Sequence, residues 1–240
     1  MSFSSTGTHS SQSIGIIGGM SWESTLLYYQ AINKGIKQAL GGLHSARIIL
    51  NSLDFAAIET LQHAGDWKGA GECMNQAAKS LERAGADFIV IATNTMHKVA
   101  NETMQDVNLP LLHIVDPTAK ALSLAGHKKV ALLGTGFTMS DQFYKGRMQA
   151  HYDFDVLVPN ENDQAIVHKI IYEELCRGTI RSESREAYLD IVSTLAEQGC
   201  EAVILGCTEI TLLIDQSHTD IPLFDTTAIH AQAAVAKALS

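Results

Sequence analysis

The sequence predicts an α/β fold of two similar parallel-sheet, Rossmann-like domains, related by pseudo-two-fold symmetry, with a ligand cleft between them. Three observations support this prediction. Short apolar runs alternate with segments of helical periodicity, the pattern restarts near residue 129, and similar polar turns recur in both halves. Apolar strands that alternate with helices are typical of a parallel sheet covered by helices on both faces.

The first half begins with a buried strand that ends in a glycine turn, Ile14-Gly15-Ile16-Ile17-Gly18-Gly19. Further apolar runs predict strands at residues 47–53, 87–92 and 111–115. Helical periodicity predicts helices at residues 22–38, 71–84 and 117–125. The Ser21-Trp22-Glu23-Ser24 run matches a helix N-cap followed by an acidic first turn.

The second half repeats this order of elements. Strands are expected at residues 129–133, 155–158, 202–205 and 223–224, and helices at residues 140–151, 163–177, 182–198 and 228–239. We expect Asp116 and Asp225 to cap the helices that follow them. Four landmarks recur in order: a glycine turn after the first strand, a glycine before a later strand, a polar turn after that strand, and a proline before the last strand. A duplicated unit explains this order.

The repeat also predicts the domain boundaries. Residues 14–116 together with 226–240 would form the N-terminal domain, and residues 117–225 the C-terminal domain. Residues 1–13 are rich in serine and threonine, with no basic start and no apolar stretch. They are therefore expected to be a flexible leader rather than a signal peptide.

Composition excludes several classes of function. Apolar residues make up 46% and charged residues 18% of the 240, and the net charge is −9. No basic cluster or bilayer-length apolar run stands out, which argues against nucleic-acid and membrane partners. The four cysteines lack CxxC spacing, so neither a metal site nor a disulfide framework is indicated. Reduced thiols favour a cytoplasmic protein.

Two polar turns are the candidate site, because each directly follows a buried strand where the next helix begins. They are Thr93-Asn94-Thr95 and Cys207-Thr208-Glu209. Backbone N–H groups at a helix start attract carboxylates. The same field is expected to lower the pKa of Cys207 and enrich its thiolate. A single cysteine after a strand is more often a small buried hydrophobe, but the duplicated position and the polar neighbours favour a functional thiol.

The chain resembles the aspartate/glutamate racemase family in three motifs: Ile14-Gly15-Ile16-Ile17-Gly18-Gly19-Met20, Asn94-Thr95-Met96-His97 and Gly206-Cys207-Thr208-Glu209. The resemblance runs from about residue 14 to the C-terminus. Residues 18–24 and 41–45 are similar to a bacterial subgroup described as aspartate or broad-range amino-acid racemases.

The resemblance implies racemisation of aspartate and/or glutamate without pyridoxal phosphate, metal or other cofactor. Two thiols on opposite faces of the substrate α-carbon exchange its proton, and donors aimed at the carboxylate stabilise the carbanion. Cys207 matches one thiol. The resemblance and the two glycine turns give the remaining expected substrate-binding residues: Met20, Ser21, Asn94, Thr95, Thr135, Thr138 and Thr208.

One departure concerns the second thiol, which is Thr93 in this chain. A threonine hydroxyl does not titrate near neutral pH, so it is a poor general acid and base. Some relatives of the subgroup share this threonine, together with a preference for the L-enantiomer. D and L amino acids have equal free energy in water, so Thr93 cannot make the net conversion one-way. We expect proton exchange on the Cys207 face to be faster than inversion.

A second departure concerns the substrate side chain. Some aspartate racemases bind its carboxylate with an arginine and a lysine, whose positions fall near Ile58 and Cys176 here. Arg177, His97 or Lys98 could take their place, although a solvated charge at a helix end explains Arg177 slightly better. Glu209 is a further candidate site residue.

Three alternatives stay open. The chain could racemise other amino acids, catalyse another thiolate reaction of the superfamily, or bind small carboxylates without catalysis. Retention of Cys207 argues against the silent binder, which has no need of a thiol. Resemblance further implies a homodimer.

Overall fold

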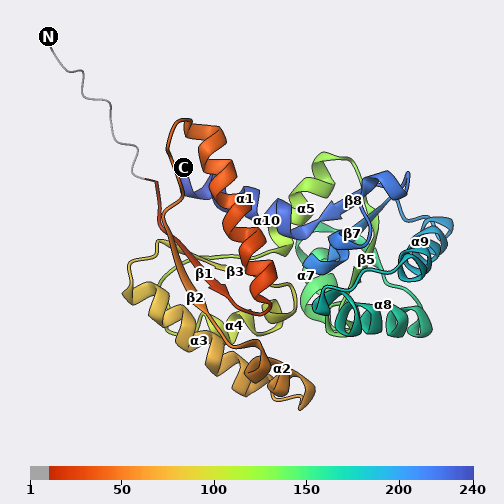
Figure 1. Cartoon of the computed structure of the whole chain (residues 1–240), viewed down its shortest axis with the longest axis horizontal. Helices are drawn as coiled ribbons and strands as arrows, with labels where there is room; N and C mark the ends of the chain where they lie inside the picture. Colours follow the sequence, from red (N-terminus) through yellow and green to blue (C-terminus); the bar gives the residue numbers. More distant parts are fainter. Residues whose placement is uncertain (1–10) are drawn as a thin grey trace, which may run out of the picture.

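Two four-stranded parallel sheets form the framework of the computed structural model, which describes residues 11–240 (Figure 1). The first sheet has the order β2-β1-β3-β4 and contains β1 (Ile14–Gly18), β2 (Ile48–Ser52), β3 (Phe88–Ile91) and β4 (Leu111–Leu112). The second has the order β6-β5-β7-β8 and contains β5 (Lys129–Gly134), β6 (Asp155–Leu157), β7 (Ala202–Gly206) and β8 (Leu223–Asp225). The equivalent orders confirm the α/β fold with a repeated unit.

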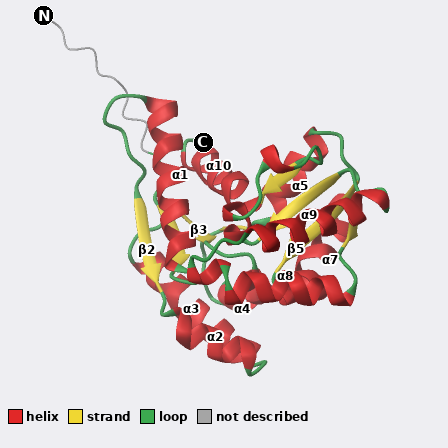
Figure 2. Cartoon of the chain, turned by 45° about the vertical axis from the view of Figure 1, so that its right-hand side comes forward, coloured by secondary structure: helices red, strands yellow, loops and turns green. Residues whose placement is uncertain are grey.

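The central strands are apolar because helices cover both of their faces (Figure 2). Every residue of β1, β3 and β7 is buried, whereas the edge strand β2 is partly exposed. In the first half the helices are α1 (Trp22–Leu40), α2 (Phe55–His63), α3 (Trp67–Arg83), α4 (Ala100–Thr103) and α5 (Val115–Leu124). In the second half they are α6 (Gly136–Ser140), α7 (Gln142–Tyr152), α8 (Glu161–Glu173), α9 (Ser182–Glu197) and α10 (Thr226–Ala238).

The part of the chain that the structure describes also contains four short 3₁₀ helices: η1 (Thr95–Val99), η2 (Leu175–Arg177), η3 (Thr208–Leu212) and η4 (Gln216–His218). Both polar turns therefore lead into 3₁₀ helices rather than α-helices. The expected helix over residues 163–177 is wrong at its end, because α8 stops at Glu173 and Gly178 closes η2 in a left-handed conformation. The sequence reasoning missed α2, which Asp54 caps by accepting from the Ala56 N–H.

The cap predictions had mixed outcomes. Ser21 caps α1 and Asp225 caps α10, as expected. The prediction for Asp116 is wrong, because α5 begins one residue earlier and this carboxylate lies in the first turn. It accepts two hydrogen bonds from the Arg147 guanidinium, at 2.7 and 2.8 Å, which explains its place in the fold.

The chain crosses between its halves at α5 and again at α10. Val115, Ala119 and Leu122 of α5 pack in the core of the second sheet, and α10 packs beside α1 on the first sheet. The division at residues 116/117 and 225/226 stays a prediction. Of the expected leader, residues 1–10 lie outside the described part, and the Gln12 N–H bonds the Ala238 carbonyl. Within residues 11–240, no helix is long and apolar enough to cross a membrane.

Candidate active site

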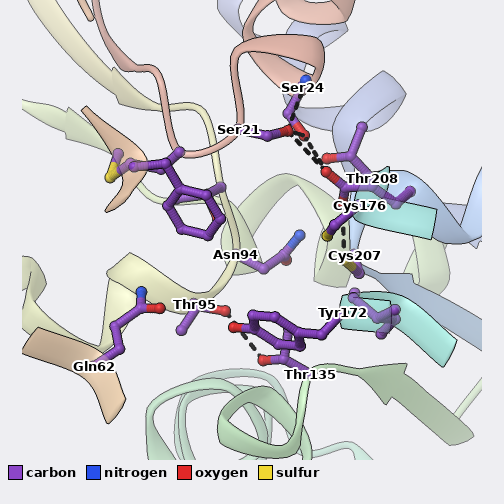
Figure 3. Close-up of a pocket in the computed structure, with 16 residues that line it drawn as sticks. Ser21, Ser24, Gln62, Asn94, Thr95, Thr135, Tyr172, Cys176, Cys207 and Thr208 are labelled. Carbon is purple, nitrogen blue, oxygen red and sulfur yellow. Dashed lines mark hydrogen bonds between the residues drawn. The ribbon is translucent and has the colours of Figure 1, made fainter. Parts of the chain in front are cut away.

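The polar turns after β3 and β7 line one pocket, which draws residues from both halves of the chain (Figure 3). These strands hold equivalent positions in the two sheets, so their carboxyl ends present Thr93 and Cys207 to the same space. The lining residues are Met20, Ser21, Ser24, Phe55, Gln62, Thr93, Asn94, Thr95, Thr135, Ile171, Tyr172, Cys176, Gly206, Cys207, Thr208 and Glu209. Ligands of α/β sheets bind at such strand ends.

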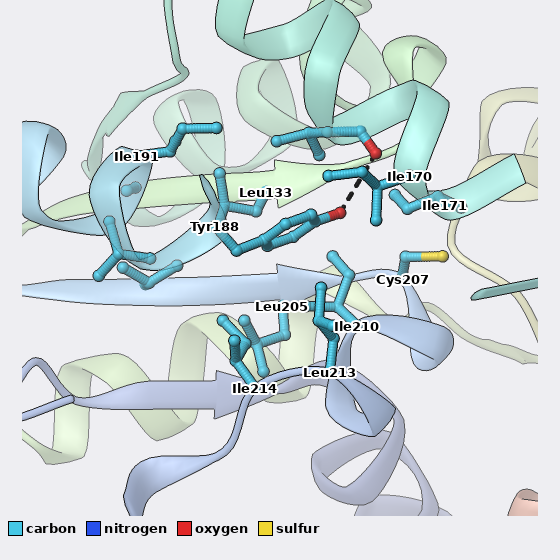
Figure 4. Close-up of a cluster of buried hydrophobic side chains, with 14 of the residues drawn as sticks. Leu133, Ile170, Ile171, Tyr188, Ile191, Leu205, Cys207, Ile210, Leu213 and Ile214 are labelled. Atoms are coloured by element: carbon cyan, nitrogen blue, oxygen red, sulfur yellow. Dashed lines mark hydrogen bonds between the residues drawn. The ribbon is translucent and has the colours of Figure 1, made fainter. Parts of the chain in front are cut away.

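A hydrogen-bond network centred on Glu209 holds the cysteine. The Cys207 thiol donates to Glu209 Oε2 at 3.0 Å, while Ser21 Oγ and Ser24 Oγ donate to Oε1 at 2.9 and 3.1 Å. The serines belong to the start of α1 and the glutamate to η3, so this carboxylate joins the two halves. Cys207 itself lies at one end of the apolar core that β7, α8 and α9 help to form (Figure 4).

The expectation that the pKa of Cys207 is lowered is wrong. Burial raises the pKa of the Cys207 thiol well above its usual range, and the negative charge of Glu209 raises it further. These effects exceed any influence of the short 3₁₀ helix that follows. Cys207 is therefore a thiol that donates a hydrogen bond to a carboxylate.

A neutral histidine supports the turn at Thr93. His97 Nδ1 donates to the Thr93 carbonyl at 2.9 Å, and Nε2 accepts from the Ile114 N–H at 3.2 Å. Burial lowers the pKa of His97 well below its usual value, and the neighbouring rings of His113 and His230 lower it further. Both nitrogens of the ring are thus occupied by backbone groups. His97 itself does not line the pocket.

Hydroxyl and amide groups form the polar wall of the pocket. Thr95 Oγ1 and Thr135 Oγ1 lie 3.1 Å apart, which links the two halves, and Thr138 Oγ1 lies 3.1 Å behind Thr135. Thr138 therefore contacts a residue that lines the pocket but does not line it itself. The Asn94 amide donates to Thr226 Oγ1 at 3.0 Å, and Thr208 Oγ1 lies 2.9 Å from Thr227 Oγ1.

Sequence reasoning missed several lining residues, and three residues that it included, His97, Thr138 and Arg177, do not line the pocket. Phe55 and Gln62 come from α2, and Tyr172 and Cys176 come from the end of α8 and from η2. Arg177, next to Cys176, is exposed and does not line the pocket. Neighbouring residues of a helical turn point in different directions, so Cys176 lines the pocket while Arg177 is exposed.

The cavity volume of the pocket is about 30 Å³. No cluster of three or more histidine, cysteine or acidic side chains suited to a metal ion occurs within residues 11–240. The pocket is thus a nearly closed space of hydroxyl, amide, thiol and carboxylate groups.

The fold and the pocket define an α/β protein with a ligand site between two equivalent halves. The chain belongs to the Asp/Glu/Hydantoin racemase family, whose model matches residues 17–234. It is 51% identical to a candidate Asp/Glu racemase from Yersinia pestis, with a TM-score of 0.90 over 95% of this chain and 100% of that one. For an aspartate racemase homologue from Pyrococcus horikoshii OT3 the identity is 35% and the TM-score 0.82, with 95% and 100% of the chains covered. The broad specificity amino-acid racemase RacX of Bacillus subtilis is 27% identical over 170 residues, which cover 68% of this chain and 70% of that protein.

Proposed function

We propose that the protein racemises amino acids by removing and returning the α-proton, with Cys207 as the thiol acid and base and Thr93 in the place of a second thiol. The observation that carries this proposal is that the two residues follow equivalent strands and line one pocket. Family membership supports an amino-acid racemase, and the family resemblance supports a reaction without a cofactor.

The pocket offers donors for the charge that develops during the reaction. When the α-proton leaves, the electrons of the C–H bond move onto the α-carbon and its carboxylate. Donors already aimed at the carboxylate stabilise this carbanion most when water is excluded. The hydroxyls of Thr95, Thr135 and Thr208 are buried at the pocket, and we assign them, with nearby backbone N–H groups, to the substrate carboxylate.

Proton abstraction requires the Cys207 thiolate, and Glu209 is placed to take the thiol proton. Transfer from an ordinary cysteine to an ordinary glutamate is uphill by about four pK units, about 6 kcal/mol. The substrate ammonium lowers this cost, because a positive charge near Cys207 favours its thiolate. The thiolate then takes the α-proton, and the proton on Glu209 keeps the charge balanced.

The opposite face decides between exchange and inversion. Return of the proton from Cys207 restores the starting enantiomer, whereas inversion needs a proton from the side of Thr93. A hydroxyl is a weak acid, so we expect inversion to be slower than exchange for the enantiomer whose α-hydrogen faces Cys207.

Aspartate and/or glutamate are the substrates that the resemblance predicts, and relatives that are an aspartate racemase of Picrophilus torridus and a glutamate racemase of Koribacter versatilis support the same pair. The broad specificity described for RacX favours the alternative, a racemase of other amino acids. A homodimer and a cytoplasmic location stay predictions.

The decisive experiment is proton NMR in D₂O across a panel of D- and L-amino acids, which follows α-hydrogen exchange and inversion together. Cys207→Ser should slow exchange by about 10²–10⁴-fold, the usual contribution of a positioned acid or base. Cys200→Ser, the same change in a buried core cysteine outside the pocket, should leave exchange near the wild-type rate.

Two outcomes would contradict the proposal. Unchanged exchange in Cys207→Ser would remove this thiol from the reaction. Binding of amino acids without any exchange would favour the catalytically silent carboxylate binder.

A further inference from the structure

The pocket has no positive side chain among the described residues that line it. None of these sixteen residues is lysine, arginine or histidine, and Glu209 supplies a carboxylate. Aspartate or glutamate would bring a second carboxylate into a buried space that already holds one. An unpaired buried charge is costly, and a like charge nearby adds to that cost. The pocket is therefore poorly suited to an acidic side chain.

The cations nearest in sequence to the site are engaged or directed elsewhere. Lys98 Nζ lies 2.6 Å from Asp141 and 3.8 Å from the centre of the Trp67 ring. The two positions expected for cations hold Ile58, which is buried in the core, and Cys176. Burial raises the pKa of the Cys176 thiol to about 12, so this group is neutral.

Two buried amide oxygens at the pocket instead lack a hydrogen-bond donor. Gln62 Oε1 and Asn94 Oδ1 have no partner among the described residues, and both side chains line the pocket while being only 3% exposed. A buried acceptor without a partner loses its bond to water and gains nothing in return. A carboxylate cannot supply the missing bond, because it only accepts, whereas ammonium, carboxamide and hydroxyl groups donate.

The orientation of Gln62 is fixed by its other contact. Its Nε2 donates to Met96 Sδ at 3.0 Å. A thioether sulfur only accepts, so turning the amide over would place two acceptors against each other. Figure 3 shows Gln62 across the pocket from Cys176 and Cys207, with its oxygen toward the interior.

We infer that the pocket selects amino acids whose side chain is uncharged and ends in a donor, a carboxamide or a hydroxyl, over aspartate and glutamate. Gln62 accepts from the side chain of the substrate, and Asn94 accepts from its α-ammonium group. This inference rests on the proposed racemase function and names its substrate class.

The test compares substrates of matched shape by α-proton exchange in D₂O. Glutamine against glutamate, and asparagine against aspartate, change the charge and the donor together. Glutamine against methionine removes the donor and keeps a neutral chain. We expect kcat/KM for exchange to be about tenfold to a hundredfold higher for each amide than for its acid, and at least about fivefold higher for glutamine than for methionine.

A positive charge introduced at Gln62 sharpens the test. Gln62→Lys should lower exchange of glutamine and raise that of glutamate, so that the ratio of their kcat/KM values falls by about tenfold or more. Gln149→Lys makes the same change on the exposed face of α7 and should leave the ratio unchanged. Gln62→Met, a neutral replacement for use where the buried lysine prevents folding, should bring glutamine down to the rate of methionine.

The outcomes separate this inference from the function on which it rests. Faster exchange of aspartate and glutamate than of their amides would overturn the substrate class and leave the racemase standing. Equal rates for glutamine and methionine would overturn the role of Gln62. Absence of exchange for every amino acid would overturn the function and the inference together.

Discussion

The turns after β3 and β7 hold equivalent places in the two sheets, yet their side chains differ in their ability to exchange protons. Cys207 donates to Glu209, a carboxylate that two serines of the other half hold in place. Thr93 has a non-titrating hydroxyl, and the histidine behind it, His97, is occupied by backbone groups. The two facing turns therefore share their position in the fold, but only one of them carries a titratable thiol. The difference predicts a reaction that is fast on one face of the substrate and slow on the other.

Removal of the Glu209 charge should have the largest effect on this asymmetry. In Glu209→Gln the amide can no longer take the thiol proton, so exchange near pH 7 should fall by about tenfold to a hundredfold. The same change removes a negative charge that raises the Cys207 pKa. The thiolate fraction of the variant should therefore grow as pH rises, and exchange should approach the wild-type rate at high pH.

The pH profile of α-proton exchange checks this prediction. Glu186→Gln is the control, because it removes the same charge from an exposed position. A loss that is the same at every pH would point to a purely structural carboxylate and would contradict the proton path.

Restoring a thiol on the other face should have a smaller effect. In Thr93→Cys a titratable group stands opposite Cys207, so the ratio of inversion to exchange should rise by about tenfold, less than an optimised acid provides. Polarimetry combined with NMR exchange measures this ratio. Thr93→Ser and the exposed Thr60→Cys should leave it unchanged, and a ratio that also stays constant in Thr93→Cys would mean that another group delivers the second proton.

The buried histidines on the Thr93 side of the pocket should affect the stability of the fold rather than catalysis. His97, His113 and His230 are buried, and each has a ring nitrogen that accepts a hydrogen bond: from the Ile114 N–H, the Val115 N–H and the Tyr28 hydroxyl. Burial, followed by the Arg147 charge, lowers the His113 pKa to about 3, and burial lowers that of His230 to about 4. The rings are therefore neutral in the folded chain.

The unfolded chain binds these protons below about pH 6.5, whereas the folded chain does not. Stability should thus be full above pH 6.5 and fall as pH decreases toward 4, by up to about 1.4 kcal/mol per histidine and pH unit. Urea unfolding at pH 7 and pH 5.5 measures the loss. His230→Gln should reduce the slope, the exposed His44→Gln should not, and equal slopes in both variants would rule out the buried ring as the cause.

Much of the site could be predicted because its signals are local. Buried strands followed by polar residues place Thr93 and Cys207 at strand ends, and parallel strands bring such ends to one edge of a sheet. Gln62 could not be found in the same way, since α2 is a nine-residue helix whose short pattern was missed between stronger ones. Cys176 lines the pocket and its neighbour Arg177 does not, because successive residues of a helical turn point in different directions. The sequence alone does not show which of the two faces the pocket.

The repeated α/β fold and the two facing turns could be predicted from the residues alone, because periodicity and strand-end motifs are properties of neighbouring residues. The protonation of Cys207 and the charge of the pocket depend instead on segments that are distant in the chain and meet on folding. Ser21 and Glu209 lie 188 residues apart in the chain, and no local pattern indicates that they share a hydrogen bond. The pKa of a thiol depends on burial and on charges brought close by folding, so the chemical state of the cysteine follows from packing rather than from its motif.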